Sequence, residues 1–454
     1  MQKKVWEYIN KHNMIKMDDH IILGISGGPD SIALLHIMKK LKEELNLKLA
    51  VAHVNHVLRP EADEEEATVK DLCSISAIPF YSYKIDVAKK AQKEKRSVEE
   101  VAREVRYQFF RKILVETKAN LIATAHHQDD NAETVLLNLL RGSGIKGLRG
   151  ILPVNGDIIR PLLGVSKVEI ETYLEDNKLP YFIDQSNFDP IYLRNKIRNQ
   201  LIPLLKEEYN PRIIENLNQL AIIAKGENEV LELESLSMYE KALIEEKPET
   251  IILNNIFLTK LNMAICKRVI LRALSNLAGE KGWEAIDVDI ILDLMTKEGS
   301  SKTVNLKKGV NVSKVYDKLI FSTLKRVKNS YDYLLSIPST ITIPDGSKYL
   351  IDIISPENFN PEEYLLYIDY DKCNPPLHLR SRKPGDFFSP YGFNGTKKIK
   401  DFFIDLKIPS YKREDILLLT DSRENVYAVL GYRVSSLAPI DNESKRILVI
   451  KSLK

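Results

Sequence analysis

The sequence predicts an α/β fold for the first half of the chain, a doubly wound parallel sheet with helices on both faces. Apolar runs of strand length, about four to eight residues, alternate with longer segments in which apolar residues recur at helical spacing. Helical sequence separates consecutive runs, which is the pattern of parallel strands joined by crossover helices. A glycine-rich turn follows the first run, where such sheets bind their ligands.

The predicted elements follow one another in a regular order. Residues 21–26 form the first strand, and residues 30–44 form the helix after it. Ser97 and Glu100 fit a capping box at the start of a later helix. The other strands are predicted at residues 47–54, 80–86 and 121–126, and the other helices at residues 64–76, 97–116 and 129–141.

The rest of the chain changes character twice. Helical segments dominate from about residue 165, namely 166–177, 194–208, about 211–245 and most of 250–298. Beyond residue 331, Pro, Gly and β-branched residues become frequent and short strands such as 339–343 and 426–432 are expected. We therefore predict a catalytic domain at 1–210, a mostly helical middle domain at 211–330 and a small α+β domain at 331–454.

Composition excludes several classes of protein. Of the 454 residues, 44% are hydrophobic and 28% are charged, as in ordinary globular proteins. No apolar stretch approaches the roughly 18 residues of a membrane span, and residues 1–14 lack the features of a secretory leader, so we expect a cytoplasmic protein without a membrane partner. Cys73, Cys266 and Cys373 lie far apart, which argues against zinc sites, disulfides and sulfur-transfer pairs.

The turn after the first strand is a candidate phosphate loop. Its glycines allow close backbone approach, the following helix directs its amides and positive dipole end at an anion, and Asp30 suits Mg²⁺ rather than phosphate. The chain has no Gly-Lys dipeptide, so it has no Walker A loop. The predicted ATP-binding residues are Ser26, Gly27, Gly28, Pro29, Asp30 and Ser31.

A second polar cluster follows the fourth strand. Asp129, Asp130 and Glu133 fall on the first turn of a helix, next to His126 and His127. Simple N-capping is one explanation, because carboxylates complement the helix dipole. Binding of Mg²⁺ or of an ammonium group is the other. The nearby Gly-Ser-Gly-Ile-Lys-Gly run follows a helix rather than a strand, so it is not interpreted as a dinucleotide site.

The loop Ser-Gly-Gly-Pro-Asp-Ser resembles that of the PP-loop ATP pyrophosphatases, whose fold is that of the adenine nucleotide α hydrolases. Further runs resemble the tRNA(Ile)-lysidine synthase family within that superfamily. These runs are HVNHVLRPEADEEEA, VAREVRYQFF, HHQDDNAET, RGSGIKGLRG, DQSNFDPIYLRNKIR and RKPGDFFSPYGFNGTKKIKDFFIDLKIPSYKRE. The resemblance spans nearly the whole chain and is weakest at about residues 210–330.

The resemblance implies a two-step reaction. The wobble cytidine of an isoleucine tRNA with a CAU anticodon attacks the α-phosphate of ATP through its C2 oxygen, and pyrophosphate leaves. Free lysine then displaces AMP through its ε-amine, which gives lysidine. The implied partners are ATP, Mg²⁺, lysine, this tRNA and a second copy of the chain.

The site residues follow from this reaction. Asp30 and Asp129 are the candidate Mg²⁺ ligands. Asp130, Glu133 and His126, in that order, are the candidates to bind the lysine ammonium group or accept its proton. Arg103 and Arg106 share one face of a predicted helix and could contact the tRNA backbone or the α-phosphate. Arg194 and Arg198 share a face of another helix and are expected near the site. Surface salt bridges are the alternative for both pairs.

A basic run between residues 380 and 413 is the candidate tRNA-binding surface, with nine Lys/Arg against three Asp. An ordinary solvated face is the alternative. Its aromatic residues, Phe387, Phe388, Tyr391 and Phe393, could stack bases or form the core of a small domain. The predicted tRNA-binding residues are Arg380, Arg382, Lys383, Lys397, Lys398, Lys400, Lys412 and Arg413.

Three other functions fit parts of the pattern. An amide-forming ligase of the same superfamily would need a source of ammonia, and the second half lacks the Cys-His arrangement of a glutaminase. A tRNA thiolase would need reactive cysteines at a closer spacing. A non-catalytic RNA-binding protein would not need both the phosphate loop and the acidic cluster.

Overall fold

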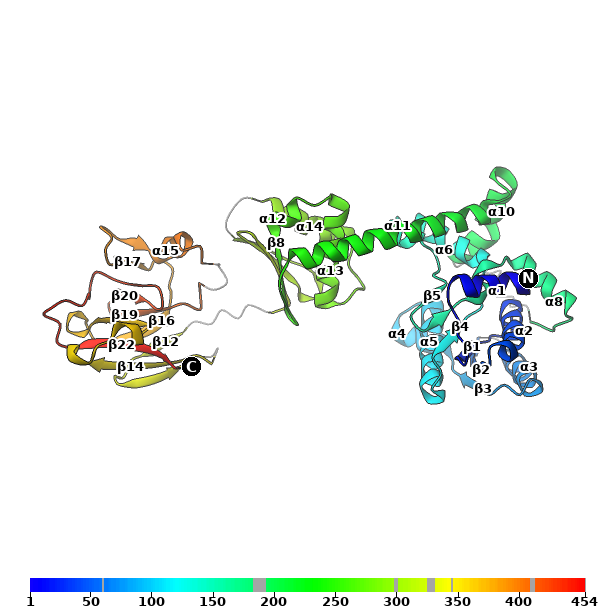
Figure 1. The fold of residues 1–454 in the computed structure, drawn as a ribbon, viewed down its shortest axis with the longest axis horizontal. Coiled ribbons are helices and arrows are strands. Elements are labelled where there is room, and N and C mark those ends of the chain that lie inside the picture. The colour runs from blue at the N-terminus through cyan, green and yellow to red at the C-terminus, as the bar shows by residue number, and fades with distance from the viewer. Residues whose placement is uncertain are drawn as a thin grey trace. The chain divides into compact units, whose positions relative to one another are not determined.

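Strand β1 (His20–Gly24) lies inside the sheet that organises the first part of the chain (Figure 1). The computed structural model describes residues 1–58, 61–182, 193–297, 301–324, 331–343, 346–408 and 413–453. The described chain forms two units, Met1–Leu231 and Glu232–Lys454, and their boundary falls within helix α11 (Ile213–Ala242).

The first unit contains the predicted parallel sheet. Its strand order is β3-β2-β1-β4-β6-β5, and only β5 (Val154–Asn155) runs antiparallel to its neighbour. Because β2 and β4 both pair with β1, the order of the chain reverses at β1. Sheets of this kind bind ligands at the carboxyl ends of the strands that flank the reversal, here β1 and β4. The other strands are β2 (Lys48–Asn55), β3 (Phe80–Lys84), β4 (Leu121–Ala123) and β6 (Ile158–Ile159).

Helices cover both faces of this sheet, because apolar side chains of β1 alternate between them. Ile21 and Leu23 belong to the core formed with α1, α2, α3 and α8, and Ile22 packs with Phe109 and Phe110 of α5 on the other face. The doubly wound prediction is therefore confirmed. The helices are α1 (Gln2–Lys11), α2 (Pro29–Glu44), α3 (Ala62–Ile75), α4 (Val87–Glu94), α5 (Val98–Thr117), α6 (Gln128–Leu140), α7 (Ile145–Leu148) and α8 (Lys167–Asp176).

The sequence prediction differs from the structure in three details. Helix α4 was not predicted, and the fourth strand ends at Ala123 instead of residue 126. The helix predicted at 194–208 is a succession of α9 (Leu193–Lys196), α10 (Ile202–Leu204) and π-type turns. The ring of Pro203 has no N–H to donate, which favours an irregular helix here.

The stretch after α11 is helical, as predicted, and it also contains a five-stranded antiparallel sheet in the order β7-β8-β11-β10-β9. The sequence indicated the later strands only as short alternating runs up to residue 322. It assigned β8 and most of β7 to helical segments, which is wrong for these strands. The helices are α12 (Asn255–Thr259), α13 (Met263–Ala278) and α14 (Ala285–Thr296). The strands are β7 (Leu243–Lys247), β8 (Thr250–Asn254), β9 (Ser301–Asn305), β10 (Asn311–Val315) and β11 (Lys318–Ser322).

The C-terminal stretch is rich in β-structure. Two sheets, β12-β16-β19-β20-β21 and β13-β14-β22-β15, enclose one apolar core that includes Leu379, Leu419 and Ile450. A second core joins the ribbon β17–β18 and helix α15 (Ile399–Asp405) to side chains of β19 and β20.

Strand bounds in this stretch are β12 (Asp332–Leu334), β13 (Ser339–Thr342), β14 (Lys348–Ile354), β15 (Leu366–Asp369), β16 (Leu377–Ser381), β17 (Phe387–Phe388), β18 (Lys397–Lys398), β19 (Leu417–Asp421), β20 (Val426–Val429), β21 (Arg433–Val434) and β22 (Ile447–Leu453). The described strands before and after residue 330 belong to separate sheets, and the domain boundary at this residue stays a prediction. Among the described helices, none has both the length and the apolar character required to span a membrane.

Candidate active site at the carboxyl ends of two strands

The phosphate loop leaves β1 and enters α2 with the backbone conformation that the glycines permit. Gly27 has φ +93°, a left-handed value that other residues rarely adopt. Gly28 is the N-cap of α2, and Pro29 occupies the first turn, where its missing N–H costs nothing. The amides of Asp30 and Ser31 have no acceptor within the helix, so they are free to face an anion.

Ser31 stabilises the loop from within. Its buried hydroxyl donates to Gly28 O at 2.8 Å and accepts from the amides of Gly27 at 3.1 Å and Ser26 at 3.2 Å. The Ser31 hydroxyl is therefore committed to the loop, whereas the Ser26 side chain is exposed. Of the two predicted ATP-binding serines, only Ser26 has a side chain exposed enough to meet a phosphate, although its hydroxyl also lies 3.4 Å from that of Ser31.

Asp30 points one carboxylate oxygen at a histidine and leaves the other without a partner. Its Oδ2 lies 3.6 Å from Nε2 of His127. Its Oδ1 is buried and has no hydrogen-bond partner among the described residues. A buried carboxylate oxygen without a donor is costly unless a cation or ligand completes it.

His127 connects the two halves of the site. It is buried at the N-terminus of α6, with Oδ2 of Asp130 3.5 Å from its Nε2 and Oδ2 of Asp129 3.5 Å from its Nδ1. Burial by itself lowers the pKa of His127, but Asp130, Asp129 and Asp30 raise it well above its ordinary value. The sequence could not distinguish His127 from His126, and this residue was absent from the predicted set.

His126 has the opposite character. Its Nδ1 lies 3.0 Å from the hydroxyl of Thr124, and burial together with neighbouring arginines lowers its pKa to about 3, against the attraction of Asp130. One of these arginines is Arg160, a buried residue that donates to Leu152 O at 2.6 Å. A histidine with this pKa stays neutral near pH 7 and is a weak proton acceptor.

Asp130 and Glu133 form ion pairs with two arginines that lie far from them in the sequence. Arg198 Nε donates to Glu133 Oε1 at 2.5 Å, and Arg194 Nε donates to Glu133 Oε2 at 2.9 Å. Both arginines also donate to Asp130 Oδ1, at 3.2 Å from Arg194 and 3.0 Å from Arg198. These hydrogen bonds bring α6 together with residues that follow it by more than sixty positions.

This four-residue cluster balances two negative and two positive side chains. The carboxylate of Glu133 is 2% exposed, while Arg194 and Arg198 are 26% and 31% exposed. Despite burial, which raises it, the pKa of Asp130 is lowered by His127, His126 and the two arginines. Asp130 Oδ2 also accepts from the His127 amide at 3.1 Å, so the carboxylate caps α6 and pairs with arginine at the same time.

Asp129 faces away from this cluster. Its Oδ2 accepts from the amide of Lys167 at 2.9 Å, at the start of α8. Despite burial, the hydrogen bonds from His127 and Lys167 lower the pKa of Asp129. This carboxylate joins α6 to α8, which makes it a less suitable metal ligand than Asp30.

Arg103 and Arg106 lie exposed on α5. In the described part of the chain, neither forms an ion pair with a carboxylate. Arg103 lies over the ring of Tyr107 at 5.2 Å. Burial, then the charge of Arg106, lowers the pKa of His56, the residue after β2, to about 4.

In the basic run at 380–413, some cationic side chains are buried or paired with carboxylates, and others are exposed without such a partner among the described residues. Arg380 is buried and donates to Asp386 at 2.8 and 2.9 Å, and Arg413 is buried and donates to Ile408 O at 2.8 Å. Lys412 lies outside the described residues. The exposed lysines without a carboxylate partner among the described residues are Lys398, Lys400 and Lys407. The ion pairs are Arg382–Glu414, Lys383–Glu424 and Lys397–Asp405.

The aromatic residues of this run also differ in their exposure to solvent. Phe388 is buried in the core with Phe402 and Phe403 of α15. Phe387, Tyr391 and Phe393 are 63%, 52% and 52% exposed. The core interpretation is therefore right for Phe388 and wrong for the other three.

Two further features take no part in the site. Burial raises the pKa of Cys73 and of Cys266 to about 11, and that of Cys373 to about 12, so all three remain unreactive thiols.

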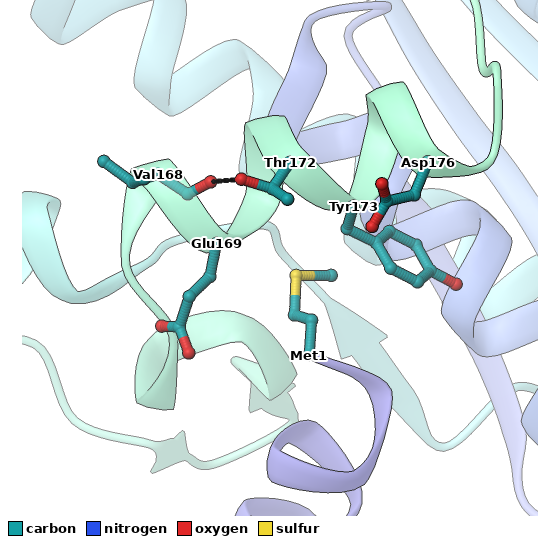
Figure 2. A pocket seen from close by; sticks show the side chains of 6 residues that line it. All are labelled: Met1, Val168, Glu169, Thr172, Tyr173 and Asp176. Carbon is teal, nitrogen blue, oxygen red and sulfur yellow. Dashed lines mark hydrogen bonds between the residues drawn. The ribbon is translucent and has the colours of Figure 1, made fainter.

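A small cavity beside α8 contains none of the predicted site residues (Figure 2). It is lined by Met1, Val168, Glu169, Thr172, Tyr173 and Asp176.

Comparison with known proteins gives matches along the whole chain. Residues 1–205 match the family model described as PP-loop domain, and residues 377–450 match the model described as TilS substrate C-terminal domain. The chain is 40% identical to the tRNA(Ile)-lysidine synthase of Caldanaerobacter subterraneus subsp. tengcongensis, over 100% of this chain and 98% of that relative. It is 37% identical to the tRNA(Ile)-lysidine synthase of Clostridium tetani, over 98% of this chain and 96% of that relative.

Proposed function

Because the chain belongs to the tRNA(Ile)-lysidine synthase family, we propose that it ligates free L-lysine to C2 of the wobble cytidine of the isoleucine tRNA with a CAU anticodon. The enzyme is an ATP-dependent ligase that converts ATP to AMP and pyrophosphate. The observation that carries the proposal is the meeting of the phosphate loop and the acidic cluster at the adjoining carboxyl ends of β1 and β4, where His127 lies 3.6 Å from Asp30.

The first step transfers AMP to the base. The cytidine C2 oxygen attacks the α-phosphorus of ATP, and the bond to the bridging oxygen of pyrophosphate breaks. The amides of Asp30 and Ser31 at the start of α2 are the donors for the departing anion. Arg103 and Arg106, exposed on α5, are candidates to contact the α-phosphate or the tRNA backbone.

Asp30 is the residue that would hold Mg²⁺. Its buried, unpartnered Oδ1 fits a cation, and the ion would neutralise charge on the pyrophosphate. Among the described residues, no three His, Cys, Asp or Glu side chains have the arrangement of a metal site. A nucleotide-bound Mg²⁺ needs only one or two protein carboxylates, because phosphate oxygens and water complete its shell. Asp129, already bonded to Lys167, is the second choice.

The second step uses free lysine. Lysine carries a carboxylate and two amines, and a cluster with two carboxylates and two guanidinium groups has partners for both kinds of charge. Arg194 and Arg198 complement the substrate carboxylate, while Asp130 and Glu133 complement an ammonium group. The lowered pKa of Asp130 suits a charge partner for the ammonium group, and the pKa of about 3 disfavours His126 as the proton acceptor.

One assay tests the activity. The full-length protein is incubated with ATP, radiolabelled lysine and an unmodified isoleucine tRNA with a CAU anticodon. Label should enter this tRNA and should not enter the same tRNA with guanosine at the wobble position. Absence of label with folded enzyme contradicts the lysidine function. The homodimer implied by the resemblance and the cytoplasmic location expected from the composition remain parts of the proposal, and sedimentation equilibrium measures the former.

A further inference from the structure

Three aromatic rings on the C-terminal part of the chain are exposed although the core beside them is complete. Phe388, Phe402 and Phe403 fill that core and are at most 9% exposed. Phe387, Tyr391 and Phe393, from the same short stretch, leave more than half of their surface in water. Exposed rings that the core does not need make this stretch a candidate binding surface.

The ribbon β17–β18 places one of these rings next to a free cation. Phe387 lies directly opposite Lys398, and Phe388 lies opposite Lys397. Opposed side chains of an antiparallel pair start about 5 Å apart and share one face. Phe387 and Lys398 therefore form the outward face, and both are exposed.

The charge of Lys398 is available. Its neighbour Lys397 pairs with Asp405 and lies 6.0 Å from the ring of Phe393. Within the described residues, no carboxylate pairs with Lys398 or with Lys400, which is also exposed. The outward face thus combines a flat apolar ring with uncompensated positive charge.

The backbone that presents the other two rings is held in place. The Tyr391 amide donates to Val434 O at 2.9 Å, and the Phe393 amide donates to Pro390 O at 3.0 Å. Arg433 donates to Tyr391 O at 3.0 Å. Side chains presented on an anchored backbone lose less conformational freedom when they bind a ligand.

We propose that Phe387 and Lys398 form a stacking site for an unpaired nucleotide of the tRNA, with the base on the ring and a backbone phosphate on the ammonium group. A nucleotide has a π-face and a negative charge, which matches this pair in both respects. Bases inside a duplex are already stacked, so the ligand is a single-stranded segment. The inference rests on the proposed function, because it takes the tRNA as the bound molecule.

Variants of the full-length protein test the site through the affinity for the unmodified isoleucine tRNA at several salt concentrations. Phe387→Leu keeps apolar bulk and removes the ring, and it should weaken binding by about 5- to 100-fold with an unchanged salt dependence. Phe387→Tyr keeps the ring and should bind within about twofold of wild type. Lys398→Gln should weaken binding and reduce the log–log salt slope by about one. The Phe387 variants should bind a blunt-ended RNA duplex with the same affinity as the wild-type protein.

Equal affinities of wild type and Phe387→Leu for the tRNA would overturn the proposal. If Phe387→Leu instead changes the sedimentation mass of the free protein, the face is a contact between copies and the proposal is wrong. Lysine incorporation by the wild-type protein reports on the proposed function separately. If lysine is incorporated but the affinity for tRNA does not depend on Phe387, only the stacking site is wrong. If the affinity for tRNA depends on Phe387 but no lysine is incorporated, only the proposed activity is wrong.

Discussion

Arg198 Nε and Glu133 Oε1 lie 2.5 Å apart in a hydrogen-bonded ion pair that joins α6 to a segment 65 residues later in the chain. The carboxylate is buried and the guanidinium group is partly exposed, so a ligand can approach this ion pair from the side of the arginine. A charged ligand that enters from that side meets partners already oriented by each other. Under the proposed function this ligand is free lysine, whose carboxylate and ammonium groups complement the two members of the pair.

Glu133→Gln removes the charge while keeping the shape. The loss of charge-assisted hydrogen bonds to Arg194 and Arg198 should lower the free energy of unfolding by about 1–3 kcal/mol, with the smaller values reflecting solvent at the arginines. The KM for lysine should rise at least about tenfold, while ATP–pyrophosphate exchange with tRNA continues. Glu229→Gln is the control, because Glu229 is exposed on α11. A variant that loses exchange as well would place Glu133 in the first step.

Asp30→Asn should abolish ATP–pyrophosphate exchange if this carboxylate holds Mg²⁺, because an amide oxygen is a weaker ligand for a hard cation. The fold should be retained, since the amide keeps the shape of the carboxylate, Oδ1 has no partner among the described residues, and only the 3.6 Å contact of Oδ2 with His127 loses its charge. Asp129→Asn should reduce exchange less, and Asp71→Asn, at an exposed position of α3, should not change it. Exchange that persists in Asp30→Asn at low Mg²⁺ removes this residue from the metal site.

Gly27→Ala and Gly28→Ala separate backbone strain from phosphate access. Gly27 has φ +93°, so a Cβ there should strain the loop by about 1–2 kcal/mol and weaken ATP binding. Gly28 has φ −73°, which alanine adopts freely, and a Cβ there meets nothing closer than 3.6 Å. Gly28→Ala should therefore keep the melting temperature of wild type, and any loss of ATP affinity measured by calorimetry would show that phosphate approaches this glycine closely. A Gly27→Ala protein of unchanged stability would contradict the strain argument.

Lysines 397, 398 and 400 should contribute unequally to tRNA binding. The double variant Lys398→Ala with Lys400→Ala should weaken binding and flatten its salt dependence by one to two phosphate contacts, about 0.7–0.9 of slope for each. Lys397→Ala should have a smaller effect because Asp405 already neutralises this charge. Filter binding across a range of salt measures both quantities. An unchanged slope in the double variant would support the solvated-face interpretation.

The cysteines should be dispensable for activity. Each thiol is buried and its pKa is raised to 11 or 12, so none is available as a nucleophile at neutral pH. Cys73→Ala, Cys266→Ala and Cys373→Ala should each incorporate lysine at near wild-type rates, with about 1 kcal/mol of lost stability where packing is reduced. Loss of activity in a folded variant would revive sulfur chemistry as an alternative.

Local sequence was sufficient to predict the sheet and the phosphate loop. Buried strands and amphipathic helices follow from the spacing of apolar residues, and the turn between β1 and α2 depends on Gly27 and on the helix that begins at Pro29. The clustering of acidic residues at the start of α6 is equally local. The five-stranded sheet after α11 was missed because its strands are short and their pairing connects segments far apart in the chain.

Only the tertiary structure decided which charges are free. Asp130 and Glu133 meet Arg194 and Arg198 across 61 to 68 residues, and no local pattern predicts such a contact.

The same holds for the basic run. Arg382 and Lys383 are neutralised by Glu414 and Glu424, which lie 32 and 41 residues away, while Lys398 has no such partner in the described structure. The sequence by itself determined the residue types and the fold that gathers them. Folding decided their ionic partners and burial, because both depend on side chains that only packing brings within a few ångströms.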